Sequence, residues 1–240
     1  MRYFNTAGPC QPDFNYMLPA AARLPEAGRL VGQRGYFVLH APRQSGKTTT
    51  LLALAQELTN AGRYAAVLVS AEVGAAFRDD IGAAELAMLA DWQSAAQVWL
   101  PAELRPPQKW PESAPGQRIR TALAAWAVHC PRPLVLFVDE IDALEGDTLL
   151  SVLRQLRSGY PGRPQAFPWS LALIGLRDVR DYKVAAGGSE RLNTASPFNI
   201  KVRSLTLGNF TAAEVAELYR QHTASPGRSS PPKPSPGPFI

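Results

Sequence analysis

The feature that most constrains this chain is an apolar run that leads into a short polar turn ending in Gly-Lys-Thr. Tyr36 to His40 reads as a buried strand, and the turn after it is Ala41-Pro42-Arg43-Gln44-Ser45-Gly46-Lys47-Thr48. A helix follows, in which apolar side chains recur at i, i+3, i+4 and i+7: Leu51, Leu54, Ala55 and Leu58. At such a junction successive backbone N–H groups converge on a concavity that binds oxyanions. The sequence therefore predicts a phosphate-binding loop.

Two residues of this turn carry specific chemistry. In the usual pattern, G-x-x-x-x-G-K-[ST], the lysine contacts the β- and γ-phosphates of a nucleotide and the hydroxyl ligates Mg²⁺. Lys47 and Thr48 occupy these positions, whereas Ala41 stands where the first glycine is usual. Because the motif departs from the pattern, its interpretation depends on the elements around it. We expect the nucleotide to contact the whole turn, namely Pro42, Arg43, Gln44, Ser45, Gly46, Lys47, Thr48 and Thr49.

Further apolar runs alternate with helical patterns along the chain. Buried strands are expected at Tyr64 to Val69, Leu134 to Val138, Ser170 to Ile174 and around Phe198 to Leu207. Strands that alternate with helices form parallel sheets, and the helices cover the two faces of the sheet. We therefore predict an α/β fold, a three-layer core with a mostly parallel sheet of about five strands and helices on both faces.

Several polar residues mark the expected ends of helices. Asp147 is expected to cap a helix that stops at Gly159. Thr211 and Glu214 have the spacing of a capping box, which predicts a helix from Thr211 to about His222.

Two adjacent acids follow the third strand directly, in Asp139-Glu140-Ile141-Asp142. In a parallel sheet, ligands bind beyond the carboxyl ends of the strands, and the phosphate-binding loop also occupies such an end. We expect the two motifs to meet there, with Asp139 ligating the metal ion and Glu140 polarising a water for attack on the γ-phosphorus. Alternatively, Glu140 or Asp142 caps the next element, and for Asp142 a capping or solvated role is expected.

Arg177 follows the fourth strand and is a third candidate catalytic residue. Its guanidinium would contact the γ-phosphate, or it would pair with Asp178 or Asp181 at the surface. His40 precedes the loop at the end of the first strand, where a structural role is expected.

The composition favours a globular protein without a membrane segment. The chain has 240 residues, and no apolar stretch approaches the ~20 residues that a membrane helix needs. We expect it to be cytoplasmic, and Cys10 and Cys130 have no metal-type spacing. Its net charge of +5 comes from scattered residues, which supports nucleic-acid binding only weakly. Residues 1–35 are expected to form a lead-in, 36–222 the core and 224–240 a disordered tail rich in Pro and Ser.

The chain resembles the AAA-like, signal-transduction type of P-loop ATPases, in the branch (ASCE) with a catalytic glutamate after the aspartate of the second motif. The resemblance covers roughly residues 1–222 and implies a P-loop NTPase core that uses ATP and Mg²⁺. Its most specific parts are the turn 41–49, Leu136-Phe137-Val138-Asp139-Glu140-Ile141-Asp142 and Leu173-Ile174-Gly175-Leu176-Arg177.

In that family ATP binds between the core and a following helical lid, often beside a regulatory domain. After His222 only the proline-rich tail remains, so no lid residue can be assigned. We expect the chain to lack its lid and regulatory domains, and hypothesise that its reading frame is truncated or shifted near Ala224. Adenine contacts are expected from the lead-in, near Phe14 to Leu24.

The expected function is a Mg-dependent ATP hydrolase that acts as a nucleotide switch. Its partners would be ATP or ADP and a protein partner or a second copy of the chain, without a membrane. ATP is favoured over GTP because the guanine-selecting Asn-Lys-x-Asp pattern is absent. The alternatives are a DNA-associated ATPase (motor or loader) and a truncated ATP-binding module with little turnover. A small-molecule kinase is less favoured, because the pair Asp139-Glu140 suits activation of water.

Overall fold

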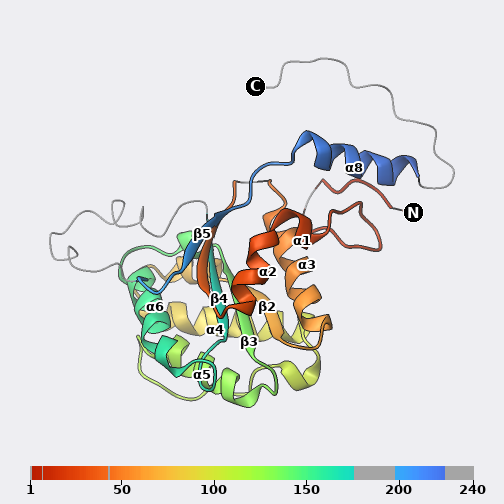
Figure 1. Ribbon diagram of the computed structural model, residues 1–240. Coiled ribbons are helices and arrows are strands. Elements are labelled where there is room, and N and C mark those ends of the chain that lie inside the picture. Colours follow the sequence, from red (N-terminus) through yellow and green to blue (C-terminus); the bar gives the residue numbers. More distant parts are fainter. Residues whose placement is uncertain (1, 7, 43, 176–197, 225–240) are drawn as a thin grey trace.

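The structure, a computed structural model, describes residues 2–6, 8–42, 44–175 and 198–224. Its centre is a five-stranded sheet in the order β2-β3-β4-β1-β5, and every neighbouring pair of strands is parallel (Figure 1). The predicted α/β fold is therefore confirmed, with a sheet that is parallel throughout. The strands are β1 (Tyr36–His40), β2 (Ala65–Ser70), β3 (Leu134–Asp139), β4 (Ser170–Gly175) and β5 (Arg203–Thr206).

The strands form where the sequence has continuous apolar runs, because the sheet is covered on both faces. Every residue of β3 and β4 is buried. Alternate residues of a strand point to opposite faces. In β1, Tyr36 and Val38 belong to one hydrophobic core, whereas Phe37 and Leu39 belong to the other. Two cores, one on each face, therefore hold the three layers together.

Helices from different parts of the chain supply the two outer layers (Figure 1). Trp92 and Trp126 are the largest fully buried side chains, and both lie in the same core. Their indole N–H groups donate to the carbonyl oxygens of Ser70 (2.7 Å) and Leu104 (3.1 Å). One layer contains α4 (Ile81–Trp99), α5 (Arg118–His129) and α6 (Gly146–Gly159), and the other contains α1 (Ala20–Arg23), α2 (Pro25–Gly32) and α3 (Lys47–Asn60).

Short 3-10 helices complete the connections. One of them lies within the proline-rich connector 101–115. They are η1 (Glu72–Phe77), η2 (Ala102–Leu104), η3 (Ile141–Ala143) and η4 (Tyr160–Gly162).

Two local expectations from the sequence are wrong. The fifth strand begins at Arg203 instead of near Phe198, because Phe198 lies in a turn and packs into a core. Asp147 does not cap α6, since Glu145 occupies the capping position and Asp147 lies in the first turn. There its carboxylate is favoured by the helix dipole without capping the backbone.

The helix α8 (Ala212–Thr223) begins as the sequence predicts. Glu214 N donates to Thr211 Oγ1 (3.2 Å), and Thr211 N donates to a carboxylate oxygen of Glu214 (2.7 Å), which completes the capping box. No residue of α8 is buried, and the helix lies beside the N-terminal segment, away from the sheet (Figure 1). There the Gln221 side chain forms two hydrogen bonds with the backbone of Met17, of 3.3 and 2.9 Å.

Gly159, at the end of α6, allows the close approach of the Phe167 ring. A Cβ at Gly159 would lie 2.2 Å from a ring atom of Phe167, which is buried in the core. We expect Gly159→Ala to destabilise the fold by about 1–3 kcal/mol through overpacking, measured by urea unfolding.

Gly28 provides the control, because it lies in α2 and a Cβ there would meet nothing within 4 Å. Gly28→Ala should leave the free energy of unfolding unchanged or raise it by up to about 1 kcal/mol, since alanine favours helix. Equal stability of the two variants would contradict this account of Gly159.

In the part of the chain that the structure describes, no helix is long and apolar enough to cross a membrane.

Candidate functional site

The predicted loop lies at the carboxyl end of β1, and α3 begins within its motif at Lys47. Gly46 caps the helix with φ of 76°, a left-handed conformation that glycine adopts at little cost. The buried Ser45 closes the turn by donating its hydroxyl to the Pro42 carbonyl (2.9 Å). The first N–H groups of a helix have no partner within the helix, and they carry the positive end of its dipole. The turn is therefore shaped to bind an anion.

The second motif meets the loop across the edge of the sheet. Lys47 Nζ lies 2.6 Å from Asp139 Oδ1, and Thr48 Oγ1 donates to Asp139 Oδ2 at 3.4 Å. Asp139 is the last residue of β3 and is 5% exposed, so this carboxylate is held in place by its strand. The structure thus brings together the three side chains that the sequence assigned to phosphate and metal.

These residues fit a magnesium ion bound together with a nucleotide. Mg²⁺ prefers oxygen ligands and is usually held by one or two carboxylates together with substrate phosphates. The Thr48 hydroxyl and the Asp139 carboxylate are neighbouring oxygen ligands of this kind. Within the described ranges, no group of three or more His, Cys, Asp or Glu side chains is arranged to hold a metal ion.

Glu140 adopts a conformation that few residues other than glycine adopt. Its φ is 55°, and its backbone N–H donates to Asp139 Oδ1 (2.8 Å). A left-handed conformation costs a residue with a side chain roughly 1–2 kcal/mol. Strain of this kind is concentrated at functional sites, where the surrounding structure holds it.

A third acid at this edge, Glu72, was not predicted from the sequence. It opens η1 shortly after β2, and its carboxyl interacts with that of Glu140. Burial is the main reason why the pKa of Glu140 rises to about 7; the hydrogen bond and charge of Glu72 and the charge of Asp139 add to the rise, and Lys47 opposes it. The available signal was positional, because Glu72 also follows a strand that ends at this edge of the sheet.

Comparison with known proteins agrees with this geometry. The sequence matches the family described as "AAA domain" over residues 31–182. The chain belongs to the AAA domain family. Comparison with curated proteins yields no significant match. Among solved structures, a Walker-type ATPase of Pyrococcus abyssi is similar with a TM-score of 0.51 and 13% identity, over 90% of this chain and 60% of that one. The chain therefore spans about 60% of that structure's length, and the likeness shows a shared fold.

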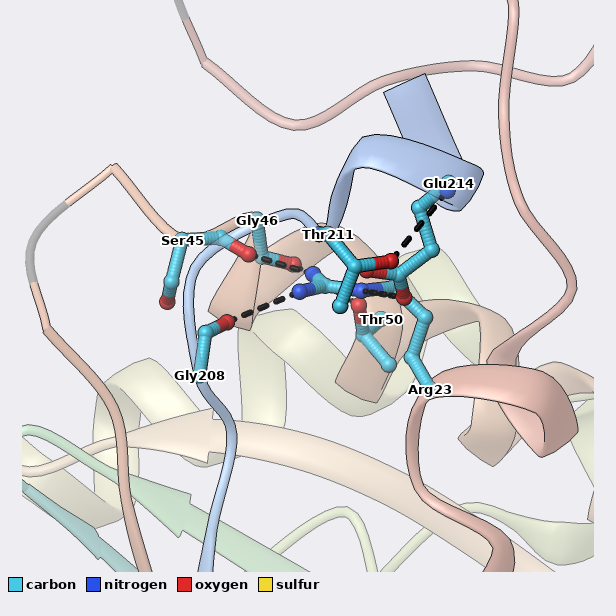
Figure 2. Close-up of polar contacts among 7 residues, drawn as sticks. All are labelled: Arg23, Ser45, Gly46, Thr50, Gly208, Thr211 and Glu214. Carbon is cyan, nitrogen blue, oxygen red and sulfur yellow. Dashed lines mark hydrogen bonds and ion pairs between the residues drawn. The ribbon is translucent and has the colours of Figure 1, made fainter. Parts of the chain in front are cut away.

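Arg23, which precedes the matched AAA domain, was also not predicted from the sequence and contacts the loop from outside. Arg23, at the end of α1, donates from Nη1 to the Ser45 carbonyl and from Nη2 to the Gly208 carbonyl (2.8 Å), and its Nε lies 3.1 Å from Glu214 Oε1 (Figure 2). These partners lie 22 to 191 positions away in the sequence, so no local pattern could indicate them.

The remaining predicted residues divide into two groups. Thr49 lies in the first turn of α3, where its hydroxyl accepts a hydrogen bond from the Cys10 backbone N–H (3.0 Å). Asp142 lies in η3 and His40 at the end of β1. Two candidates for phosphate contact, Arg43 and Arg177, lie outside the described residues, as do Asp178 and Asp181.

Proposed function

We propose that this AAA domain binds ATP with Mg²⁺ and hydrolyses it to ADP and phosphate. The observation that carries the proposal is the meeting of Lys47 and Thr48 with Asp139 at the mouth of the loop. The usual pattern assigns the lysine to phosphate and the hydroxyl to the metal ion. Both side chains contact the carboxylate that would share the ion.

The binding step uses the loop and its lysine. Backbone N–H groups at the start of α3 would hold the phosphates. Lys47 would leave Asp139 and contact the β- and γ-phosphate oxygens. Thr48 and Asp139 would hold the metal ion. When it is bound, Mg²⁺ neutralises charge on the phosphate oxygens.

The chemical step is assigned to Glu140. A water oxygen forms a bond to the γ-phosphorus, the bond from that phosphorus to the β–γ bridging oxygen breaks, and ADP carries away its electron pair. Glu140 accepts the proton of the attacking water. Arg177 stays a proposed contact of the γ-phosphate.

The contacts of the loop support a switch role. The loop is tied through Arg23 to α8, an exposed helix, so nucleotide binding can alter a surface distant from the phosphates. We propose that a protein partner or a second copy of the chain recognises that change. In such switches the γ-phosphate orders segments that are released after hydrolysis.

Phosphate release by the purified chain tests this function. We expect release from ATP with Mg²⁺, little release when EDTA removes the ion, and a lower rate with GTP. Lys109→Ala is a matched control, because Lys109 pairs with Glu112 in an ion pair that is almost fully exposed. Release that persists in EDTA would contradict the metal assignment. Strong stimulation by DNA would favour a DNA-associated ATPase instead.

A further inference from the structure

Arg23 joins three parts of the chain that are far apart in sequence. Its side chain is 4% exposed and contacts the carbonyl of Ser45 in the loop, the carbonyl of Gly208 after β5, and Glu214 in α8 (Figure 2). The guanidinium also lies over the Phe210 ring, with 4.1 Å from Cζ to the ring centroid. A planar guanidinium with five N–H donors is suited to several acceptors at once.

The contact with Ser45 fixes the direction of a backbone donor in the loop. The Ser45 carbonyl and the Gly46 N–H belong to one peptide unit, and in a trans peptide these groups point in opposite directions. By holding the carbonyl on the outside of the turn, Arg23 directs the Gly46 N–H to the other side. The Thr50 hydroxyl donates a hydrogen bond to the next carbonyl, that of Gly46 (2.9 Å). The two bonds together set the orientation of the peptides on either side of Gly46.

The packing around Gly46 shows how closely these parts approach. A Cβ at Gly46 would lie 3.2 Å from Arg23 Nη1 and 3.2 Å from Phe210 Cζ. The residues that lead into α8 therefore rest on the loop itself. A shift of α8 would move the guanidinium against the Ser45–Gly46 peptide.

Glu214 connects this contact to the start of α8. One of its carboxylate oxygens accepts from Thr211 N in the capping box, and the other accepts from Arg23 Nε (3.1 Å). The first turn of α8 and the loop are consequently bridged by one ion pair. The other end of α8 is attached separately, through ring contacts of Tyr219 and His222 with Phe4 (5.4 Å each).

We infer that Arg23 is a positioning residue that couples nucleotide binding at the loop to the order of α8. The inference rests on the proposed function for the nucleotide, whereas the bridge itself is seen in the contacts of Arg23. Coupling between two sites is reciprocal, so a nucleotide that steadies the loop must steady α8, and loosening of α8 must weaken nucleotide binding.

Two variants separate the bridge from the helix cap. Arg23→Gln removes the guanidinium. Glu214→Gln removes the charge that Arg23 contacts but keeps a capping box, because glutamine also serves at that position. Glu217→Gln is the matched control, since the ion pair of Glu217 in the described part of the chain is with Arg220 of the same helix (2.6 Å).

Amide hydrogen exchange without nucleotide tests the bridge directly. We expect Arg23→Gln and Glu214→Gln to speed exchange both in α8 and in the loop residues 45–50, and Glu217→Gln to leave the loop unchanged. Faster exchange in α8 alone would overturn the inference. Because this arm needs no nucleotide, it stays decisive even if the proposed function fails.

Calorimetric titration with ATP tests the coupling. We expect wild type to bind ATP, and hydrogen exchange with ATP present to show added protection of α8. Both bridge variants should bind ATP about 10-fold more weakly, within the 5–150-fold range typical of coupled sites. Unchanged affinity and full protection of α8 in Glu214→Gln would overturn the inference. Absence of ATP binding by wild type would instead overturn the proposed function.

Discussion

Lys47→Ala is expected to lower the affinity for ATP by about 10–100-fold. A hydrogen bond to a charged group contributes about 1.5–3 kcal/mol, and each 1.4 kcal/mol corresponds to a factor of about ten. Lys47 lies 2.6 Å from Asp139 and is 16% exposed, so its ammonium is close to where the phosphates would bind. Calorimetric titration of ATP with Mg²⁺ measures the effect.

Loss of the lysine also leaves the nearly buried Asp139 carboxylate without its ion pair. Thermal unfolding of Lys47→Ala must therefore accompany the titration, so that lost affinity is not confused with an unfolded protein. Lys109→Ala should bind ATP as wild type does, because its ion pair lies in solvent. If Lys47→Ala and wild type bound ATP with equal affinity, the interpretation of the loop as a phosphate-binding loop would be wrong.

Glu140→Gln is expected to bind ATP nearly as wild type does but to hydrolyse it about 10²–10⁴-fold more slowly, the usual contribution of a general base. Glutamine has nearly the same shape and can still hydrogen-bond Glu72, but it cannot accept the proton of the attacking water. Phosphate release over a single turnover measures the chemical step separately from product release.

The neighbouring Glu145→Gln is a suitable control for this variant. Glu145 is exposed and flanks the start of α6, so its replacement should leave turnover unchanged. If Glu140→Gln hydrolysed ATP at the rate of wild type, another group would have to accept the proton. Loss of ATP binding in Glu140→Gln would point to a role in shaping the site rather than in the chemistry.

The sheet and the core of the site could be predicted because their signals are local. Apolar runs identify central strands, and the alternation with helices makes the sheet parallel. The carboxyl ends of β1 and β3 must then share one edge, which brings Lys47 to Asp139. The start of the fifth strand was less predictable. Phe198 is a buried core residue that lies in a turn, so its apolar side chain does not indicate a strand.

Glu72 and Arg23 escaped prediction for a different reason. The role of each is set by a partner on another element: Glu72 meets Glu140 across β2 and β3, and Arg23 meets Ser45 and Glu214 across α1, the loop and α8. A single acid after a strand or a single arginine in a helix has many uses, and only the three-dimensional contacts select one.

The connection between β5 and α8 determines how α8 can move. Leu207 is buried and its N–H donates to the His40 carbonyl at the base of the loop (2.8 Å), so the chain is fixed to β1 until that residue. Rotation of α8 is thereby confined to Gly208–Phe210, before the cap at Thr211. A helix of 12 residues is about 18 Å long, so a tilt of about 10° at this pivot would move its far end by about 3 Å and would break the hydrogen bonds between Gln221 and Met17. Under the proposed switch function, a partner would recognise a displacement of this size.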